Sequence, residues 1–414
     1  MRIAIIGAGV SGSIIATGLA KLPGVAVSVF ERVGPEDHDL AGNGLNVGPN
    51  AIKSLRASIP ELAAQLEATS LPWTAWTTWT MEGDLLYCIP LQEVAENNGI
   101  RIRWAELYRI CRQGARDIIQ FYTECTSVKK QLSSSGVQIN LELLDSRMGS
   151  RSTMSNVDLL IVADGRFSSI RAQLYGRSPV TYLGVANFRV LLNDQGRMPL
   201  DDLEQWYNGP HRLLAFRLVD GLIYLSGNFP IEPNAETTAE QKRADFLRKV
   251  YTPASGRMAS TPQWLLDSAC EAEQELHWSR AQESTGLWHD ETGHILFPGD
   301  SGHPMVPTLG QGATLAIEDA CIFVNLFQHY WGKALSGSID IPALTREFAV
   351  LRDERTEFIK RFSWDASDTL RPGSDAIADN RKKNGPDYRA KLRRMYVDIP
   401  SMPASQPGPP MVRV

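Results

Sequence analysis

The sequence predicts an α/β protein with a Rossmann-type dinucleotide-binding domain, an inserted β-sheet domain and helices at the C-terminal end. Three observations carry this prediction. A Gly-x-Gly-x-x-Gly motif lies between two apolar segments within residues 2–31. Two later apolar segments end in Asp164-Gly165 and Gly299-Asp300. Residues 178–283 consist of short apolar segments separated by turn signals, which is typical of an antiparallel sheet.

Composition limits the class of protein. The chain has 414 residues, enough for roughly two or three domains. Its net charge is −5 and it has no basic block, so we expect neither nucleic acid nor a membrane as partner. The five cysteines show no Cys-x-x-Cys spacing, which predicts no metal site and a reducing, cytoplasmic location. Glycines interrupt the N-terminal apolar run, which argues against a signal peptide.

The first glycine motif has the setting of a dinucleotide-binding loop. An apolar strand precedes it, a helix follows, and a second strand ends in Glu31. We expect Gly7 to form the tight turn, Gly9 to let a pyrophosphate approach the backbone, and Gly12 to let helix and strand pack closely. Free N–H groups at the helix N-terminus favour phosphate binding, and Glu31 suits ribose hydroxyls.

The later motifs complete a set. "VDLLIVADG" and "HILFPGD" each place a carboxylate, Asp164 and Asp300, at the end of an apolar strand. With the first motif in the same order, they resemble the FAD-dependent aromatic hydroxylases (group A flavoprotein monooxygenases), the class that includes salicylate hydroxylase and 6-hydroxynicotinate monooxygenase. Residues 42–56 and 344–359 also resemble family segments, so that the resemblance covers residues 1–365.

The resemblance implies FAD as cofactor and a GR2-like FAD-binding domain. It implies a discontinuous FAD-binding domain of residues 1–72, 101–177 and 284–365, a substrate domain of 73–100 and 178–283, and a C-terminal extension of 366–414 with a disordered end. The implied cofactor-binding residues are Gly7, Gly9, Val10, Ser11, Gly12, Glu31, Arg32, Asn43, Gly44, Arg103, Asp164, Gly165, Gly299, Asp300, Pro307, Gly310, Gln311, Gly312 and Ala313.

The two glycine-rich loops would then hold opposite ends of one cofactor. The first would bind the pyrophosphate. In the second, "PTLGQGATLAIEDA", residues 310–313 would place helix N-terminal N–H groups at the flavin N1/C2=O edge, where reduced flavin is negative. Pro307 resembles the family proline beside the flavin.

The implied reaction uses NADH or NADPH as a transient reductant and O2 as co-substrate. A flavin C4a-hydroperoxide would hydroxylate an aromatic or N-heteroaromatic small molecule of the phenol or hydroxypyridine type, with loss of a ring substituent as an option. Ionising such a ring requires a base. His211 and Tyr224 are the candidates, and the sequence does not decide between them. Arg189, Arg212 or Arg217 could bind a substrate carboxylate.

Some features depart from the family pattern or leave alternatives open. Trp104 stands where the family usually has an arginine, which is displaced to Arg103. We expect the three tryptophans of one series, Trp73, Trp76 and Trp79, to lie mainly in the core.

Alternative functions remain open. They are a Baeyer–Villiger or epoxidising oxygenase and an FAD-dependent reductase without oxygen insertion, whereas the halogenase Trp-x-Trp-x-Ile-Pro motif is missing. The sequence leaves substrate identity, NADH against NADPH, and oligomeric state open.

Overall fold

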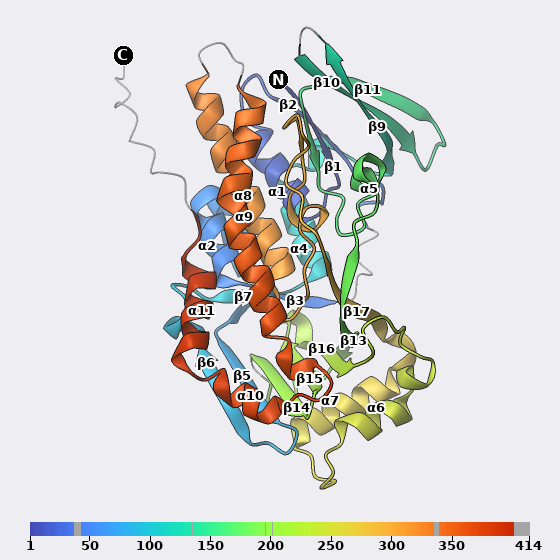
Figure 1. The fold of residues 1–414 in the computed structure, drawn as a ribbon, viewed down its shortest axis with the longest axis vertical. Coiled ribbons are helices and arrows are strands. Elements are labelled where there is room, and N and C mark those ends of the chain that lie inside the picture. The colour runs from blue at the N-terminus through green and yellow to red at the C-terminus, as the bar shows by residue number, and fades with distance from the viewer. Residues whose placement is uncertain (37–42, 134–135, 195, 201, 335–338, 401–414) are drawn as a thin grey trace.

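The computed structural model describes residues 1–36, 43–133, 136–194, 196–200, 202–334 and 339–400 (Figure 1). The molecule is elongated and has two parts. A parallel sheet with long helices forms one end, and a larger, mostly antiparallel sheet forms the other (Figure 1).

Five short strands form the parallel sheet, in the order β18–β12–β1–β2–β8. Its strands are predominantly apolar because helices cover one face and a three-stranded antiparallel sheet covers the other. The strands are β1 (Arg2–Ile6), β2 (Ala26–Phe30), β8 (Ile119–Gln120), β12 (Leu159–Val162) and β18 (Ile295–Leu296). The covering elements are α1 (Val10–Leu19), α4 (Trp104–Gln113), α8 (Gln311–Lys333), β9 (Thr123–Ser133), β10 (Gly136–Asp145) and β11 (Arg151–Val157).

The second sheet has seven strands in the order β17–β13–β16–β15–β14–β5–β6, and only the β14–β5 pair is parallel. Two helices pack on one of its faces. The elements are β5 (Ala75–Thr80), β6 (Leu85–Pro90), β13 (Val180–Asn193), β14 (Leu203–Asn208), β15 (His211–Arg217), β16 (Leu222–Pro230), β17 (His277–Ser284), α6 (Ala244–Tyr251) and α7 (Ser260–Glu271).

Two hairpins form within this sheet. β5 and β6 pair across the Glu82–Asp84 segment, and β15 pairs with β16. At the second turn Asp220 and Gly221 have φ of 60° and 71°, which is the left-handed backbone that a tight hairpin turn needs.

A small sheet and two helices lie between the two parts (Figure 1). They are β3 (Gly44–Val47), β4 (Leu71–Trp73), β7 (Gly99–Arg103), α2 (Pro49–Ser58) and α3 (Pro60–Ala68). β3 lies against β16 of the large sheet and against α8 of the other part. The segment implied to run along the flavin is therefore at the junction of the two parts.

The chain ends in helices. The predicted closing helix is α9 (Ile341–Asp365), which packs against α8. The extension then forms α10 (Ala376–Lys382) and α11 (Pro386–Val397), and α5 (Ser169–Tyr175) follows the Asp164 motif. The proline-rich segment 402–414, expected to be disordered, lies outside the described residues.

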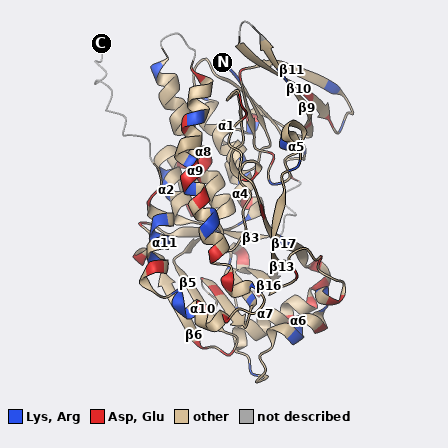
Figure 2. Ribbon diagram, in the orientation of Figure 1, with Lys and Arg blue, Asp and Glu red and all other residues tan. Residues whose placement is uncertain are grey.

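The strand order explains how segments far apart in sequence meet, because β18 pairs with β12 and β1 lies next to β12. The division into FAD-binding and substrate domains stays a prediction. Acidic and basic residues are interspersed on the same elements, for example along α9 (Figure 2). Among the described residues, no helix has both the length and the apolar character needed to cross a bilayer.

Candidate active site

The first glycine loop has the backbone that its sequence predicts. Gly7 has φ of +93°, and a Cβ there would collide with the carbonyl of Ala163. A Cβ on Gly12 would collide with the carbonyl of Gly7. Above Gly9, in contrast, the nearest atom to such a Cβ is 3.8 Å away, on Tyr108. The loop is thus tightly packed at Gly7 and Gly12 and open on the side that Gly9 faces, as a phosphate-binding backbone requires.

Glu31 and Arg112 hold this loop in place. Glu31 Oε2 accepts a hydrogen bond of 2.8 Å from Ala8 N, and Oε1 accepts one of 3.2 Å from Val33 N. Arg112 Nε donates to Ala8 O at 2.7 Å, and its Nη2 lies 3.7 Å from Glu31 Oε2. Sequence reasoning missed Arg112, because nothing in the spacing of α4 relates it to a loop a hundred residues earlier.

A cavity of about 270 Å³ opens above the loop. Asp164 Oδ1 is buried there without a hydrogen-bond partner among the described residues, and burial raises the pKa of Asp164 above its usual value. The predicted cofactor residues that line this cavity are Gly7, Gly9, Glu31, Arg32, Asp164 and Gly165. Val10 and Ser11 contribute the first turn of α1 behind it.

A second cavity of about 650 Å³ lies between the two parts of the molecule. One wall is the loop before α8, where Gly310 has φ of +65° and caps the helix. The Gln311 side chain is buried away from this cavity and accepts a hydrogen bond from Asn50 Nδ2. The predicted residues that line the cavity are Asn43, Gly44, Tyr224, Asp300, Pro307, Gly310, Gly312 and Ala313.

Four predicted cofactor residues carry buried polar atoms that have no hydrogen-bond partner in the described part of the chain. They are Asn43 Oδ1, Arg103 Nε, Asp164 Oδ1 and Asp300 Oδ1. A buried polar group without a partner is costly, so these atoms indicate a ligand with matching groups. Carboxylate and amide oxygens accept hydrogen bonds from sugar and ribityl hydroxyls, and a guanidinium donates to an anion. This donor and acceptor set fits FAD.

The segment around Trp104, which departs from the family pattern in sequence, lies beside the larger cavity. Trp104 lines the larger cavity and stacks on Tyr108 with ring centroids 5.3 Å apart. Arg166, which sequence reasoning did not single out, lines both cavities. Its Nη2 donates to Met305 O at 2.8 Å, and its Nε lies 3.8 Å from Asp300 Oδ2. Its place directly after Asp164-Gly165 was the signal that could have identified it.

The two candidate bases lie in different places. Tyr224 lines the larger cavity, and its ring packs against Phe216 at 4.8 Å. His211 does not line this cavity. It packs against Tyr251 of α6, Nδ1 contacts Asn208 O at 2.9 Å, and burial lowers its pKa. Neighbouring residues of a strand point to opposite faces, so His211 faces the helices while Arg212 faces the cavity. The geometry does not support His211 as the base.

The large sheet forms the other wall of this cavity. Arg189 and Arg212 both line it, and neither makes an ion pair with a carboxylate among the described residues. Arg217 does not line it, because its guanidinium binds Asp194 through bonds of 2.9 and 3.0 Å. Two of the three arginines considered from sequence therefore face the cavity without a carboxylate counter-charge in the described chain.

Of the three tryptophans Trp73, Trp76 and Trp79, likewise, only Trp76 lines the larger cavity. Trp73 is fully buried and packs edge-on against Trp76. Trp79 donates from Nε1 to Glu204 Oε2 at 2.7 Å. Trp76 lines the larger cavity, and its Nε1 is buried without a partner in the described chain.

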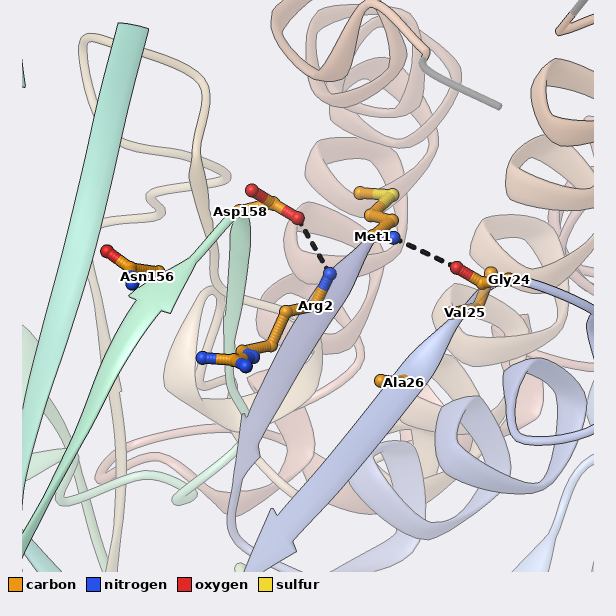
Figure 3. Close-up of a pocket in the computed structure, with 7 residues that line it drawn as sticks. All are labelled: Met1, Arg2, Gly24, Val25, Ala26, Asn156 and Asp158. Atoms are coloured by element: carbon orange, nitrogen blue, oxygen red, sulfur yellow. Dashed lines mark hydrogen bonds between the residues drawn. The ribbon is translucent and has the colours of Figure 1, made fainter. Parts of the chain in front are cut away.

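The opposite, amino-terminal edge of the parallel sheet has a shallow hollow (Figure 3). Its polar groups are already bonded: the Met1 amine donates to Gly24 O at 2.9 Å, and Arg2 N donates to Asp158 Oδ2 at 2.7 Å (Figure 3). Ligands of open parallel sheets bind at the carboxyl ends of strands, where both cavities lie. This hollow therefore has no part in the site.

The fold and the residues that line the two cavities define the class of protein as a flavin-binding oxidoreductase. No protein-family model matches the chain. It is 24% identical over 376 residues to 6-hydroxynicotinate 3-monooxygenase of Pseudomonas fluorescens, with 88% of this chain and 90% of that protein covered. It is also 24% identical to salicylate hydroxylase of Pseudomonas putida, over 416 residues, with 95% and 91% covered.

Solved structures give the same fold. Klebsiella pneumoniae HpxO in complex with FAD and uric acid has a TM-score of 0.79 at 21% identity, covering 97% of both chains. A tetrameric form of 2-methyl-3-hydroxypyridine-5-carboxylic acid oxygenase has a TM-score of 0.69 at 16% identity, covering 96% and 97%. The chain is thus similar over most of its length to FAD-dependent aromatic hydroxylases, as its three motifs predicted, and is a flavoprotein monooxygenase.

Proposed function

We propose that this enzyme uses FAD, NADH or NADPH, and O2 to hydroxylate a small aromatic or N-heteroaromatic acid. One observation carries the proposal. A single cavity of about 650 Å³ is bounded on one side by the glycine loop of α8 and on the other by Arg189 and Arg212, which have no carboxylate partner in the described chain. The implied flavin edge and an anion-binding wall thus face the same space.

The residues that would hold FAD divide between the two cavities. Gly9 and the start of α1, with Glu31 and Asp164, would bind the adenine dinucleotide end. Asp300 and the α8 loop would bind the flavin end. Bound FAD would supply the redox chemistry, accepting a hydride from the nicotinamide and activating O2.

The protein itself would contribute positive charge that binds the substrate and a cavity that excludes water. Arg189 and Arg212 would hold the substrate as an anion, because both line the cavity and a cation without a counter-ion, such as the buried Arg212, favours a negatively charged ligand. Loss of the proton from a ring hydroxyl raises the electron density of the ring, which favours its attack on oxygen. Tyr224 is the candidate to take up this proton while its own hydroxyl proton passes to solvent, since it lines this cavity. The sheet and the α8 loop exclude water from the ring.

Two further parts of the proposal concern organisation and location. The large sheet is the substrate domain, and the parallel sheet with its helices is the discontinuous FAD-binding domain. The five free thiols fit a reducing compartment such as the cytoplasm.

The test is oxidation of NADH and NADPH by the FAD-loaded protein with a panel of aromatic and N-heteroaromatic acids. Hydrogen peroxide and hydroxylated product are measured in parallel. A compound that accelerates oxidation many-fold and appears as hydroxylated product supports the proposal. Accelerated oxidation that yields ring-expanded or epoxidised product favours the other oxygenase reactions. Steady oxidation without oxygen in any product favours a reductase.

A further inference from the structure

A row of polar side chains crosses the cavity face of the large sheet. Ser279 on β17 lies directly opposite Asn187 on β13, Asn187 opposite Asn228 on β16, and Asn228 opposite Arg212 on β15. All four line the larger cavity. Asn187, Asn228 and Arg212 are 2%, 3% and 7% exposed, so their polar atoms must find partners within the protein or in a ligand.

The guanidinium of Arg212 fixes the direction of hydrogen bonding along this row. A guanidinium only donates. Its Nε and Nη2 both donate to Asn228 Oδ1, at 2.8 and 2.5 Å, so the other end of the Asn228 amide must be the Nδ2 donor. Asn228 Nδ2 donates to Asn187 Oδ1. The Asn187 amide is therefore oriented with its oxygen occupied.

The free end of Asn187 is consequently a donor. Asn187 Nδ2 is buried and has no hydrogen-bond partner among the described residues, and the residue lines the cavity. Trp76 Nε1 and Ser279 Oγ, which also belong to cavity-lining residues, are likewise buried and unpartnered in the described chain.

The Nη1 side of the Arg212 guanidinium is also fixed by hydrogen bonds. Its Nη1 donates to Gln205 Oε1 at 3.1 Å, and Gln205 Nε2 donates to Thr78 Oγ1 at 3.1 Å. The guanidinium is therefore fixed from both sides and cannot rotate to release Asn228. The polarity of the row from Arg212 to Asn187 is built into the sheet.

We propose that Asn187 determines substrate specificity by donating a hydrogen bond to an acceptor within the substrate ring, either a ring nitrogen or a ring carbonyl oxygen. Asn228 is the positioning residue that sets this polarity. The inference rests on the proposed function and narrows the substrate class to acids whose ring contains such an acceptor. A ring that offers C–H at this position leaves the buried donor unpaired and binds about ten-fold or more weakly.

The first experiment uses two matched probes and the FAD-loaded protein. 5-Hydroxynicotinate and 3-hydroxybenzoate share a carboxylate and a hydroxyl and differ in one ring nitrogen against C–H. Affinity is measured by the change in flavin absorbance on titration, without turnover. The wild-type protein should bind the ring with nitrogen about ten-fold more tightly. Equal binding of the two would overturn the proposal while leaving the proposed function intact.

Two variants test the mechanism. Asn187→Leu removes the donor, so the two probes should bind equally. Asn228→Asp keeps an acceptor for Arg212 but offers a second oxygen to Asn187, whose amide should turn and present Oδ1 to the cavity. The preference should then reverse, a result that a purely structural role of Asn228 does not give. Asn140→Leu, on β10 and remote from the cavity, is the matched control and should retain the wild-type preference.

A neutron structure of the FAD-loaded protein tests the amide directly, whatever the substrate. It should show the Asn187 Nδ2 deuterons facing the cavity. Asn187 Oδ1 on that side would overturn the proposal. Should neither probe bind and no ring acid stimulate NADH or NADPH oxidation, the proposed function fails, and the neutron assignment still decides the polarity of Asn187.

Discussion

Arg352 Nε donates to Asp319 Oδ1 at 2.7 Å, and His303 Nε2 lies 2.5 Å from the other oxygen of the same carboxylate. Gly299 N also donates to Asp319 Oδ2, at 2.8 Å. Asp319 and Arg352 are completely buried. One carboxylate on α8 thus connects α9 with the Gly299-Asp300 loop, so the position of Asp300 depends on a charge that does not itself reach the cavity.

The Asp319→Asn variant tests this connection. Removing one charge leaves Arg352 without part of its counter-charge in a fully buried site, where breaking a pair typically costs about 3–5 kcal/mol. We expect a loss of that order in the free energy of unfolding, measured by urea denaturation. Asp365→Asn, at an exposed position near the end of α9, is the control and should change stability by less than about 0.5 kcal/mol. Equal stability of both variants would contradict the connection.

The lowered pKa of the Asp319 carboxylate predicts how the free energy of unfolding depends on pH in acid. His303 and Arg352 lower the pKa of Asp319 to about 2, below the value of about 4 expected in an unfolded chain. Its contribution is therefore complete above about pH 4 and is lost as the pH falls from about 4 towards 2. Thermal unfolding of the wild type should become steeply pH-dependent in this window. The Asp319→Asn variant should show a shallower dependence, and an identical slope would argue against the assignment.

Asp300→Ala tests the cofactor assignment. Asp300 Oδ1 is buried without a partner in the described chain and faces the larger cavity, so the variant removes a charged acceptor from the implied ribityl site. A hydrogen bond to a charged group contributes about 1.5–3 kcal/mol, so FAD should bind about 10- to 100-fold more weakly. Flavin content after purification and FAD titration of the apoprotein measure this. Exposed Asp117→Ala is the control, and a full flavin complement in Asp300→Ala would refute the assignment.

Gly310→Val tests the second glycine loop. Gly310 has φ of +65°, and a Cβ there would lie 2.7 Å from Asn46 Nδ2. A β-branched residue in this backbone costs about 1–3 kcal/mol and pushes the loop towards the implied flavin edge. We expect weaker FAD binding and slower flavin reduction by NADH or NADPH in stopped-flow measurements. Gly332→Ala, in the last turn of the same helix and in open space, should behave as wild type.

How far the sequence predicts this site depends on whether a residue's role is local. Gly7, Gly12 and Gly310 follow from sequence because each belongs to a short glycine pattern that identifies a tight turn or a close approach, even where the atom approached is distant in the chain, as Ala163 O is from Gly7. Asp164 and Asp300 follow because each ends an apolar strand, and parallel strands end at one edge of the sheet.

The substrate wall could not be predicted in the same way. Ser279, Asn187, Asn228 and Arg212 come from four strands, and only the sheet register brings them into one row. His211 and Arg212 were both candidates, and sequence could not decide which of them faces the cavity, because without the register a shift of one residue exchanges the two faces of a strand. The helices α10 and α11 of the C-terminal extension were not predicted from its composition, because they are stabilised by side chains that pack onto the core.

Tyr224→Phe separates the two candidate bases. Tyr224 lines the cavity, whereas His211 faces the helices on the other side of the sheet. If the Tyr224 hydroxyl takes up the proton of a ring hydroxyl while its own proton passes to solvent, Tyr224→Phe should lower kcat by about 100-fold for a substrate that is protonated at the assay pH. The loss should be much smaller for a ring that is already ionised, because Arg189 and Arg212 hold that anion without a base. His211→Phe should leave kcat unchanged for both rings. A loss of the same size on both rings in Tyr224→Phe would instead assign Tyr224 a packing role against Phe216.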